Sequence, residues 1–131
     1  MFDRVAARAC AFFVASCVSA FIAFVSASSP AFAAGALAIG KCGAYGQAFD
    51  YPREDAARAA ALQQCKGGGC TAVPMKRACA ALSIDMKNPC GPHGYAVAPR
   101  ISNALNEATK KCYGFGGKEC VIRAWVCDAK G

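Results

Sequence analysis

The chain is poor in the residues that catalysis and metal binding most often use, because it holds one histidine and one tryptophan in 131 residues. None of its ten cysteines forms a C-x2-C pair, the spacing typical of structural zinc sites. Its basic residues never form a run of five or more, as they do in tails that bind nucleic acid. We therefore expect no metal, no cofactor and no nucleic-acid partner.

The N-terminal part of the chain has the pattern of a secretory signal peptide. Two arginines precede an uncharged, mostly apolar run at 9–27, and a Ser-Ser-Pro break follows this run. Ala31-Phe32-Ala33 then offers small residues at both positions that signal peptidase recognises. We expect residues 1–33 to be removed and the protein to be exported, either to the periplasm or out of the cell.

Two other interpretations of this segment stay open. The apolar run is close to the length that spans a bilayer, so it could remain as an uncleaved anchor. The stretch that ends at Cys17 also loosely resembles a lipoprotein cleavage site. Under the favoured interpretation, residues 34–131 form one small domain that has no stable membrane span.

Eight cysteines remain in this domain, and an even number in an exported chain predicts disulfide bonds. They form two sets of four, and the members of the second set follow their counterparts by 48, 47, 50 and 48 residues. This spacing predicts an internal repeat, with units at 35–79 and 80–127. The first set is Cys42, Cys65, Cys70 and Cys79, and the second set is Cys90, Cys112, Cys120 and Cys127.

The position of these cysteines suggests how they pair. Cys65–Cys70 and Cys112–Cys120 would each join a helix end to the next strand across a glycine turn. The other four cysteines would then pair within their units, as Cys42–Cys79 and Cys90–Cys127. We interpret all four bridges as structural, because a domain of this size buries a thin core.

Each unit reads as strand, strand, helix, strand. Short apolar or aromatic segments predict the strands, and a proline followed by an arginine opens each helix. We predict an α+β fold in which the two β-β-α-β units form one antiparallel or mixed sheet, with both helices on one face and disulfides stapling the domain. The predicted strands are 35–39, 47–51, 70–75, 80–84, 95–98 and 120–127.

Both predicted helices have a stripe of small residues. Alanines and a cysteine recur every four residues, which places them on one face that can lie close against a sheet. The stripe is Ala57, Ala61 and Cys65 in the first helix, and Ala104, Ala108 and Cys112 in the second.

The same residues carry a resemblance to a known family. Gly43-Ala44-Tyr45-Gly46, the alanine-rich helix that ends at Cys65, and Cys70 at the start of a strand all have counterparts one unit later. This pattern covers nearly all of residues 34–131 and resembles the domain of unknown function family numbered 4189. The resemblance implies a small exported bacterial domain, and it implies no catalytic residues.

Positive charge is the second feature that bears on function. The net charge is +7, and about +6 remains once residues 1–33 are removed. A basic exported domain can associate with an anionic envelope component, or with an unidentified acidic protein. Because the basic residues are scattered, a surface that only keeps the protein soluble is the alternative. We take Lys110 and Lys111, beside the stripe of the second helix, as tentative binding residues.

Four aromatic residues could add to such a binding face: Tyr45, Phe49, Tyr95 and Trp125. Aromatic side chains at strand spacing more often belong to the core, and we favour that interpretation for the group. Tyr45 and Tyr95 are kept as tentative binding residues.

No combination of residues predicts catalysis. His93 lies in a glycine turn, and every cysteine that could act with it is expected in a disulfide. Glu54 and Asp55 stand where they complement a helix dipole. We expect a non-catalytic binding or structural module. An inhibitor of a secreted hydrolase, acting through a rigid loop at 91–94, is the alternative, and an enzyme is the least favoured.

Overall fold

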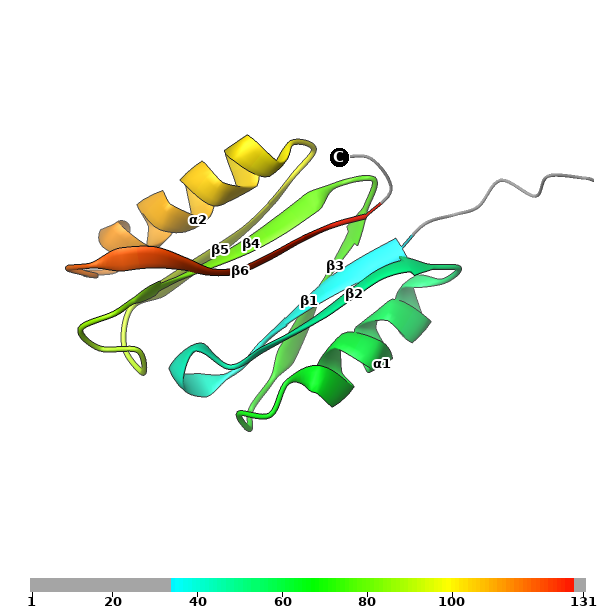
Figure 1. Ribbon diagram of the computed structural model, residues 1–131, viewed down its shortest axis with the longest axis horizontal. Coiled ribbons are helices and arrows are strands. Elements are labelled where there is room, and N and C mark those ends of the chain that lie inside the picture. The colour runs from blue at the N-terminus through cyan, green and yellow to red at the C-terminus, as the bar shows by residue number, and fades with distance from the viewer. Residues whose placement is uncertain (1–33, 129–131) are drawn as a thin grey trace, which may run out of the picture.

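The computed structural model describes residues 34–128, so the predicted signal peptide lies outside the described residues. The chain folds into two units with the same order of elements (Figure 1). This order confirms the predicted α+β fold with two β-β-α-β units. The first unit contains β1 (Ala34–Ile39), the short 3-10 turn η1 (Lys41–Gly43), β2 (Tyr45–Tyr51), α1 (Glu54–Gln64) and β3 (Thr71–Lys76). The second unit contains β4 (Cys79–Asp85), β5 (His93–Ala98), α2 (Ile101–Gly114) and β6 (Cys120–Cys127).

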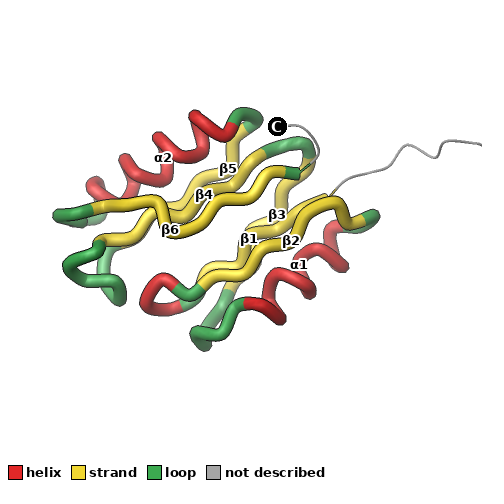
Figure 2. The backbone as a smooth tube through the Cα atoms, in the orientation of Figure 1, coloured by secondary structure: helices red, strands yellow, loops and turns green. Residues whose placement is uncertain are grey.

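The strands form two antiparallel three-stranded sheets, which corrects the expectation of one sheet. Their strand orders are β2-β1-β3 and β5-β4-β6. The sheets stack face to face, and each helix covers the outer face of its own sheet (Figure 2). The two helices therefore lie on opposite sides of the molecule instead of on one face.

The two central strands explain why the sheets stack. Every residue of β1 and of β4 is buried, so both faces of each strand need a cover. Along β1, the alanines face α1, whereas Leu37 and Ile39 face the other sheet. Strand β4 repeats this alternation, with Leu82 and Ile84 facing inward. The inter-sheet core consists of Leu37, Ile39, Met75, Ala78, Ala80, Leu82, Ile84, Ala124 and Val126.

Small residues let each helix lie close against its sheet. Both predicted stripes are buried, as expected from their spacing. Gly46 of β2 and Gly94 of β5 face these stripes from the sheet. A Cβ atom at Gly46 would overlap the backbone oxygen of Ala61, and a Cβ atom at Gly94 would overlap that of Ala108. The absence of a side chain at these two positions therefore sets the distance between helix and sheet.

All eight cysteines of the described range form disulfides, and two of the four predicted pairs are confirmed. Cys65–Cys70 and Cys112–Cys120 join each helix end to the next strand. The other two predicted pairs, Cys42–Cys79 and Cys90–Cys127, are wrong. The structure has Cys42–Cys90 and Cys79–Cys127 in their place.

Strand register explains the corrected pairs. Cys79 opens β4 and stands opposite Cys127 of β6, with their Cα atoms 4.0 Å apart. Cys42 and Cys90 lie in the turns that follow the two central strands, with their Cα atoms 3.8 Å apart. The two turns meet because the units face each other with equivalent surfaces. Of the four bridges, Cys42–Cys90 is the one that joins the two units.

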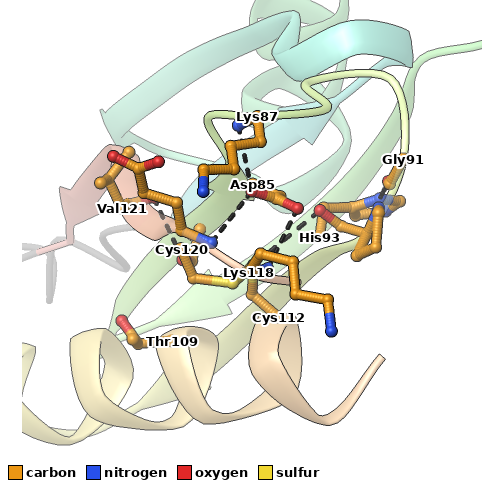
Figure 3. The surroundings of a disulfide bond; sticks show 12 residues. Asp85, Lys87, Gly91, His93, Thr109, Cys112, Lys118, Cys120 and Val121 are labelled. Carbon is orange, nitrogen blue, oxygen red and sulfur yellow. Dashed lines mark hydrogen bonds between the residues drawn. A yellow bond between two sulfur atoms is a disulfide. The ribbon is translucent and has the colours of Figure 1, made fainter. Parts of the chain in front are cut away.

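Two buried carboxylates hold the loops around this frame. Asp85 accepts hydrogen bonds from the backbone amides of Lys87, Lys118 and Glu119 at 3.0–3.1 Å, close to the Cys112–Cys120 bridge (Figure 3). The amide of Lys118 has the largest effect on the pKa of Asp85, and the three donors together lower this pKa although burial opposes them.

The second buried carboxylate, Asp128, joins the two units at the end opposite the Cys42–Cys90 bridge. One of its oxygens accepts from the amide of Asp50 and the other from the amide of Arg77, each at 3.3 Å. Its own amide donates to the oxygen of Ala78 at 2.9 Å. Asp50 and Arg77 both have positive φ angles, of 59° and 46°, so Asp128 stabilises the bulge of β2 and the turn between β3 and β4 in conformations that disfavour side chains.

Candidate binding surfaces

The four aromatic residues of the sequence analysis are exposed, so their interpretation as core is wrong. The exposed fraction is 36% for Tyr45, 56% for Phe49, 44% for Tyr95 and 55% for Trp125. Alanine, leucine, isoleucine and valine fill the inward positions instead. The aromatic residues stand on β2, β5 and β6, which are edge strands and have no hydrogen-bonded strand on one side. They are therefore available to a ligand.

Strands β2 and β6 lie side by side at the meeting line of the two sheets (Figure 1). Three of these aromatic residues stand on them: Tyr45 and Phe49 on β2, and Trp125 on β6, opposite Ala81 on the face that α2 covers. Tyr45, Gln47 and Phe49 from β2 line a hollow of about 530 Å³ together with Arg123 and Trp125 from β6. We call these five residues the β2–β6 patch.

Both strands are irregular at this patch. Between the pairs Ala34–Tyr51 and Ala36–Ala48, β1 has one residue, whereas β2 has two, Phe49 and Asp50. In β6, Arg123 is left without a partner, because Leu82 pairs with Ala124 and the next residue of β4 pairs with Ile122. Such bulges redirect side chains and are common beside functional sites.

Arg123 and Gln47 connect the two strands across the patch. The Nε of Arg123 donates to the backbone oxygen of Gly43 at 3.2 Å, and its guanidinium lies 5.5 Å from the centroid of the Tyr45 ring. The Nε2 of Gln47 donates to the backbone oxygen of Trp125 at 2.8 Å. Within residues 34–128, no carboxylate forms a salt bridge with Arg123. The patch therefore combines exposed rings with a positive charge that the described part of the chain leaves uncompensated.

A second aromatic and basic surface lies on the other edge of the second sheet. The Nζ of Lys111 donates to the backbone oxygen of Tyr95 at 3.1 Å and lies 5.9 Å from the centroid of its ring. Phe115, after α2, is 68% exposed and lines the same hollow. We call Tyr95, Lys111 and Phe115 the β5–α2 patch.

The structure thus separates the four tentative binding residues. Tyr95 and Lys111 come together, whereas Tyr45 lies on the opposite edge beside Arg123. Lys110 points to Glu107, with its Nζ 3.5 Å from Oε1. Sequence reasoning missed Arg123, because a single arginine in an apolar strand gives no signal until the bulge is known.

The segment at 91–94 leads into the second sheet, with Gly91 and Pro92 before β5 and with His93 and Gly94 inside it. Gly94 is buried in β5 against α2, and the oxygen of Pro92 accepts from the amide of Asp85 at 3.2 Å. His93 starts the strand, with its Nδ1 3.3 Å from the oxygen of Gly91. Across residues 34–128, no three His, Cys, Asp or Glu side chains gather as metal ligands would.

Comparison with known proteins places this geometry in context. A family model described as a domain of unknown function, DUF4189, matches residues 34–127. The NMR structure of Rv1813c from Mycobacterium tuberculosis is similar, with a TM-score of 0.53 and 21% sequence identity. That alignment covers 95% of this chain and 99% of the other, and at such identity it supports the fold alone. No curated protein sequence matches the chain. Neither helix of the described range is long and apolar enough to cross a membrane.

Proposed function

Since the chain belongs to the DUF4189 family, as its sequence motifs indicated, and this family carries no assigned activity, we propose that it is a non-catalytic, exported module that binds an anionic polysaccharide of the cell envelope. The observation that carries the proposal is the guanidinium of Arg123, which lies beside the Tyr45 ring of the β2–β6 patch and forms no salt bridge with any carboxylate of residues 34–128. Export is supported by the four disulfides, because such bonds persist in oxidising compartments.

The chemistry of the patch suits an acidic sugar polymer. Aromatic rings offer flat apolar surfaces against which the C–H faces of sugar rings pack. A guanidinium forms paired, charge-assisted hydrogen bonds with carboxylate or phosphate groups. The bulge of β6 and the hydrogen bond to the oxygen of Gly43 hold Arg123 in place before binding, so that little conformational entropy is lost when a ligand arrives. The net positive charge of the domain adds a long-range attraction for polyanions.

The inhibitor hypothesis has less support. It requires a stapled loop that enters the active site of a hydrolase, and the segment at 91–94 was its candidate. That segment is bound to the second sheet through Pro92 and Gly94. Of the exposed rings, Tyr95 and Phe115 line one hollow with this segment, whereas Tyr45, Phe49 and Trp125 stand on β2 and β6.

Affinity electrophoresis tests the proposal. The full chain is expressed in a host that forms disulfides, and the oxidised protein is run in gels that contain either acidic polygalacturonate or neutral dextran. We expect retardation by the acidic polymer only, and we expect it to weaken as salt rises. Arg123→Gln should weaken binding about fivefold, and Trp125→Ala about tenfold.

Arg58→Gln is the matched control, because it removes the same charge from the exposed face of α1, away from the patch. Equal loss in Arg58→Gln and Arg123→Gln would mean that net charge alone drives binding, and the patch would be the wrong site. Absence of retardation by polygalacturonate at low salt would overturn the proposed function itself. Circular dichroism of each variant confirms that the fold is kept.

A further inference from the structure

A groove opens at the opposite edge of the sandwich, between β3 and β5, and meets the β2–β6 patch only at Gly43, whose oxygen accepts the hydrogen bond of Arg123. Its volume is about 490 Å³, within the range of small-molecule sites, about 300–1,000 Å³. Residues of the inter-sheet core form its floor, and the Cys42–Cys90 bridge lies along its lining. Its apolar lining consists of Ile39, Val73, Leu82, Ile84, Pro89 and Tyr95.

The repeat shows why this groove is open. Two stacked, equivalent units present two equivalent seams, β2 beside β6 and β5 beside β3. Gln47 and Arg123 bridge the first seam, but no hydrogen bond is found between β3 and β5 in the described range. Gln47 of β2 pairs with Leu37, and Tyr95 of β5 pairs with Leu82. Tyr95 and Gln47 therefore occupy equivalent positions in the two units. The open seam therefore goes with different side chains, and β3 and β5 also approach each other less closely than β2 and β6 do.

A positive charge stands at one end of the groove. Lys41 lines the groove. The Cε atom of Lys41 lies beside Gly69, 3.6 Å from where a Cβ of that residue would be, so the aliphatic part of the side chain runs along the rim of the groove. No carboxylate of residues 34–128 forms a salt bridge with Lys41. Thr71 and His93 add polar groups to the same lining. The groove thus has an apolar body and a cationic end.

We propose that this groove binds a free fatty acid, with the alkyl chain against Val73 and Ile84 and the carboxylate at Lys41. Apolar lining favours the chain, because burying methylene groups removes them from water. The cation favours a carboxylate over an alcohol or an ammonium head group. The groove is a single seam between two strand edges, so it accommodates one alkyl chain and not the two chains of a phospholipid.

Chain length and head group give separate tests. The probes are octanoate, decanoate, decanol and decyltrimethylammonium, each used below its micelle concentration. They are titrated into the isotope-labelled, oxidised protein, which is produced from the full-length sequence in a host that exports it. We expect amide shifts at 39–43, 69–73 and 89–95 in the NMR spectrum. Affinity should rise about fourfold for each methylene that enters the groove. The fluorescence of Trp125, on the opposite edge, should stay unchanged.

Two variants locate the binding mode. Lys41→Gln should weaken decanoate binding about fivefold and leave decanol binding unchanged, since an exposed ion pair contributes only modestly. Lys110→Gln, which removes the same charge from α2, is the control and should change neither. Thr71→Trp fills the groove from an exposed edge position and should abolish binding of both probes.

Several results would overturn the proposal. Decanoate shifts confined to the β2–β6 patch would place the ligand elsewhere, and equal binding of decanoate and decyltrimethylammonium would remove the role of Lys41. Unchanged decanoate affinity in a folded Thr71→Trp protein would exclude the groove. If that variant does not fold, the Lys41→Gln comparison and the map of shifts decide alone. Binding of phospholipid vesicles without binding of free decanoate would replace the fatty acid by a membrane surface.

Discussion

Replacing Gly46 by alanine should destabilise the domain more than any change of similar size on its surface. Gly46 lies in β2 directly beneath α1, where an added Cβ would overlap the oxygen of Ala61 and lie 2.9 Å from the amide nitrogen of Cys65. Both obstacles are backbone atoms, so no side chain can rotate away. The whole helix would have to move from the sheet, and Cys65, which is bonded to Cys70, resists this movement.

The size of the effect follows from this geometry. Overpacking of a core costs about 1–3 kcal/mol, and the upper end applies here because the strain cannot relax locally. A loss of about 3 kcal/mol is a large part of the about 5–15 kcal/mol that stabilises a typical domain. For a domain of this length it corresponds to a melting temperature lower by roughly 12–24 °C. Gly94→Ala should behave alike, since its Cβ would lie 2.5 Å from the amide nitrogen of Cys112.

Chemical denaturation of the oxidised proteins, followed by circular dichroism, measures this loss. Gly114→Ala is the control, because Gly114 ends α2, is exposed and has no atom within 4 Å of an added Cβ. Alanine there should leave stability unchanged or raise it by up to about 1 kcal/mol. Free energies of unfolding that agree within about 0.5 kcal/mol for Gly46→Ala and the unchanged protein would refute close helix docking as the reason for the glycine.

Three further predictions concern one disulfide and the two buried carboxylates. Low concentrations of dithiothreitol should release thiols at Cys42 and Cys90 first, because both are exposed, whereas each of the other three bridges has a buried cysteine. The released thiols are alkylated and identified by mass spectrometry, and a different pair labelled first would contradict the prediction. Because the pKa of Asp85 is lower in the folded state, its carboxylate stabilises the fold at pH values above its unfolded-state pKa of about 3.9, and this stabilisation is lost as the pH falls through the folded-state pKa. In Asp85→Asn, the free energy of unfolding should therefore fall less steeply as the pH is lowered through this range. Asp128→Ala should cost about 2 kcal/mol in urea unfolding by leaving two amides without acceptors, and a neutral result would mean that water replaces the carboxylate.

The sequence already contained the signal for stacked sheets. Both central strands are apolar at successive positions, which is typical of strands covered on both faces. One helix per unit covers only one face, so the second face of each strand needed another sheet. The prediction of one sheet with both helices on one side overlooked this requirement. The helix stripes and the order of elements were predictable, because periodicity is local and does not depend on how the units meet.

The disulfides show where sequence spacing misleads. The 48-residue separation of Cys79 and Cys127 matched the repeat, but these residues stand opposite each other in one sheet. At the equivalent position of the first unit, Ala34 of β1 pairs with Lys76 of β3. The Cys79–Cys127 bridge therefore has no counterpart in the first unit. The two local bridges were predictable because a helix end and the next strand are close in any such unit. The bridge between units required knowledge of how they face each other.

The candidate surfaces were the least predictable feature. Whether Trp125 or Tyr45 lies in the core or on the surface depends on which strands form the edges, and strand order is a long-range property. Arg123 acquires its position from a bulge that one extra residue creates. Neither property leaves a pattern in the local sequence.

The two seams differ in a way that stability does not explain. The Cys42–Cys90 bridge and the carboxylate of Asp128 join the units at their two ends, so neither seam has to carry the interface alone. Exposed rings on edge strands leave much of their surface in contact with solvent and invite association between sheets, which proteins usually avoid with polar side chains. Phe49, Tyr95 and Trp125 occupy such positions although small polar residues would fit them. We propose that two ligands of different chemistry explain the aromatic residues at both seams: the redirected Arg123 would bind one, and the open apolar groove would bind the other.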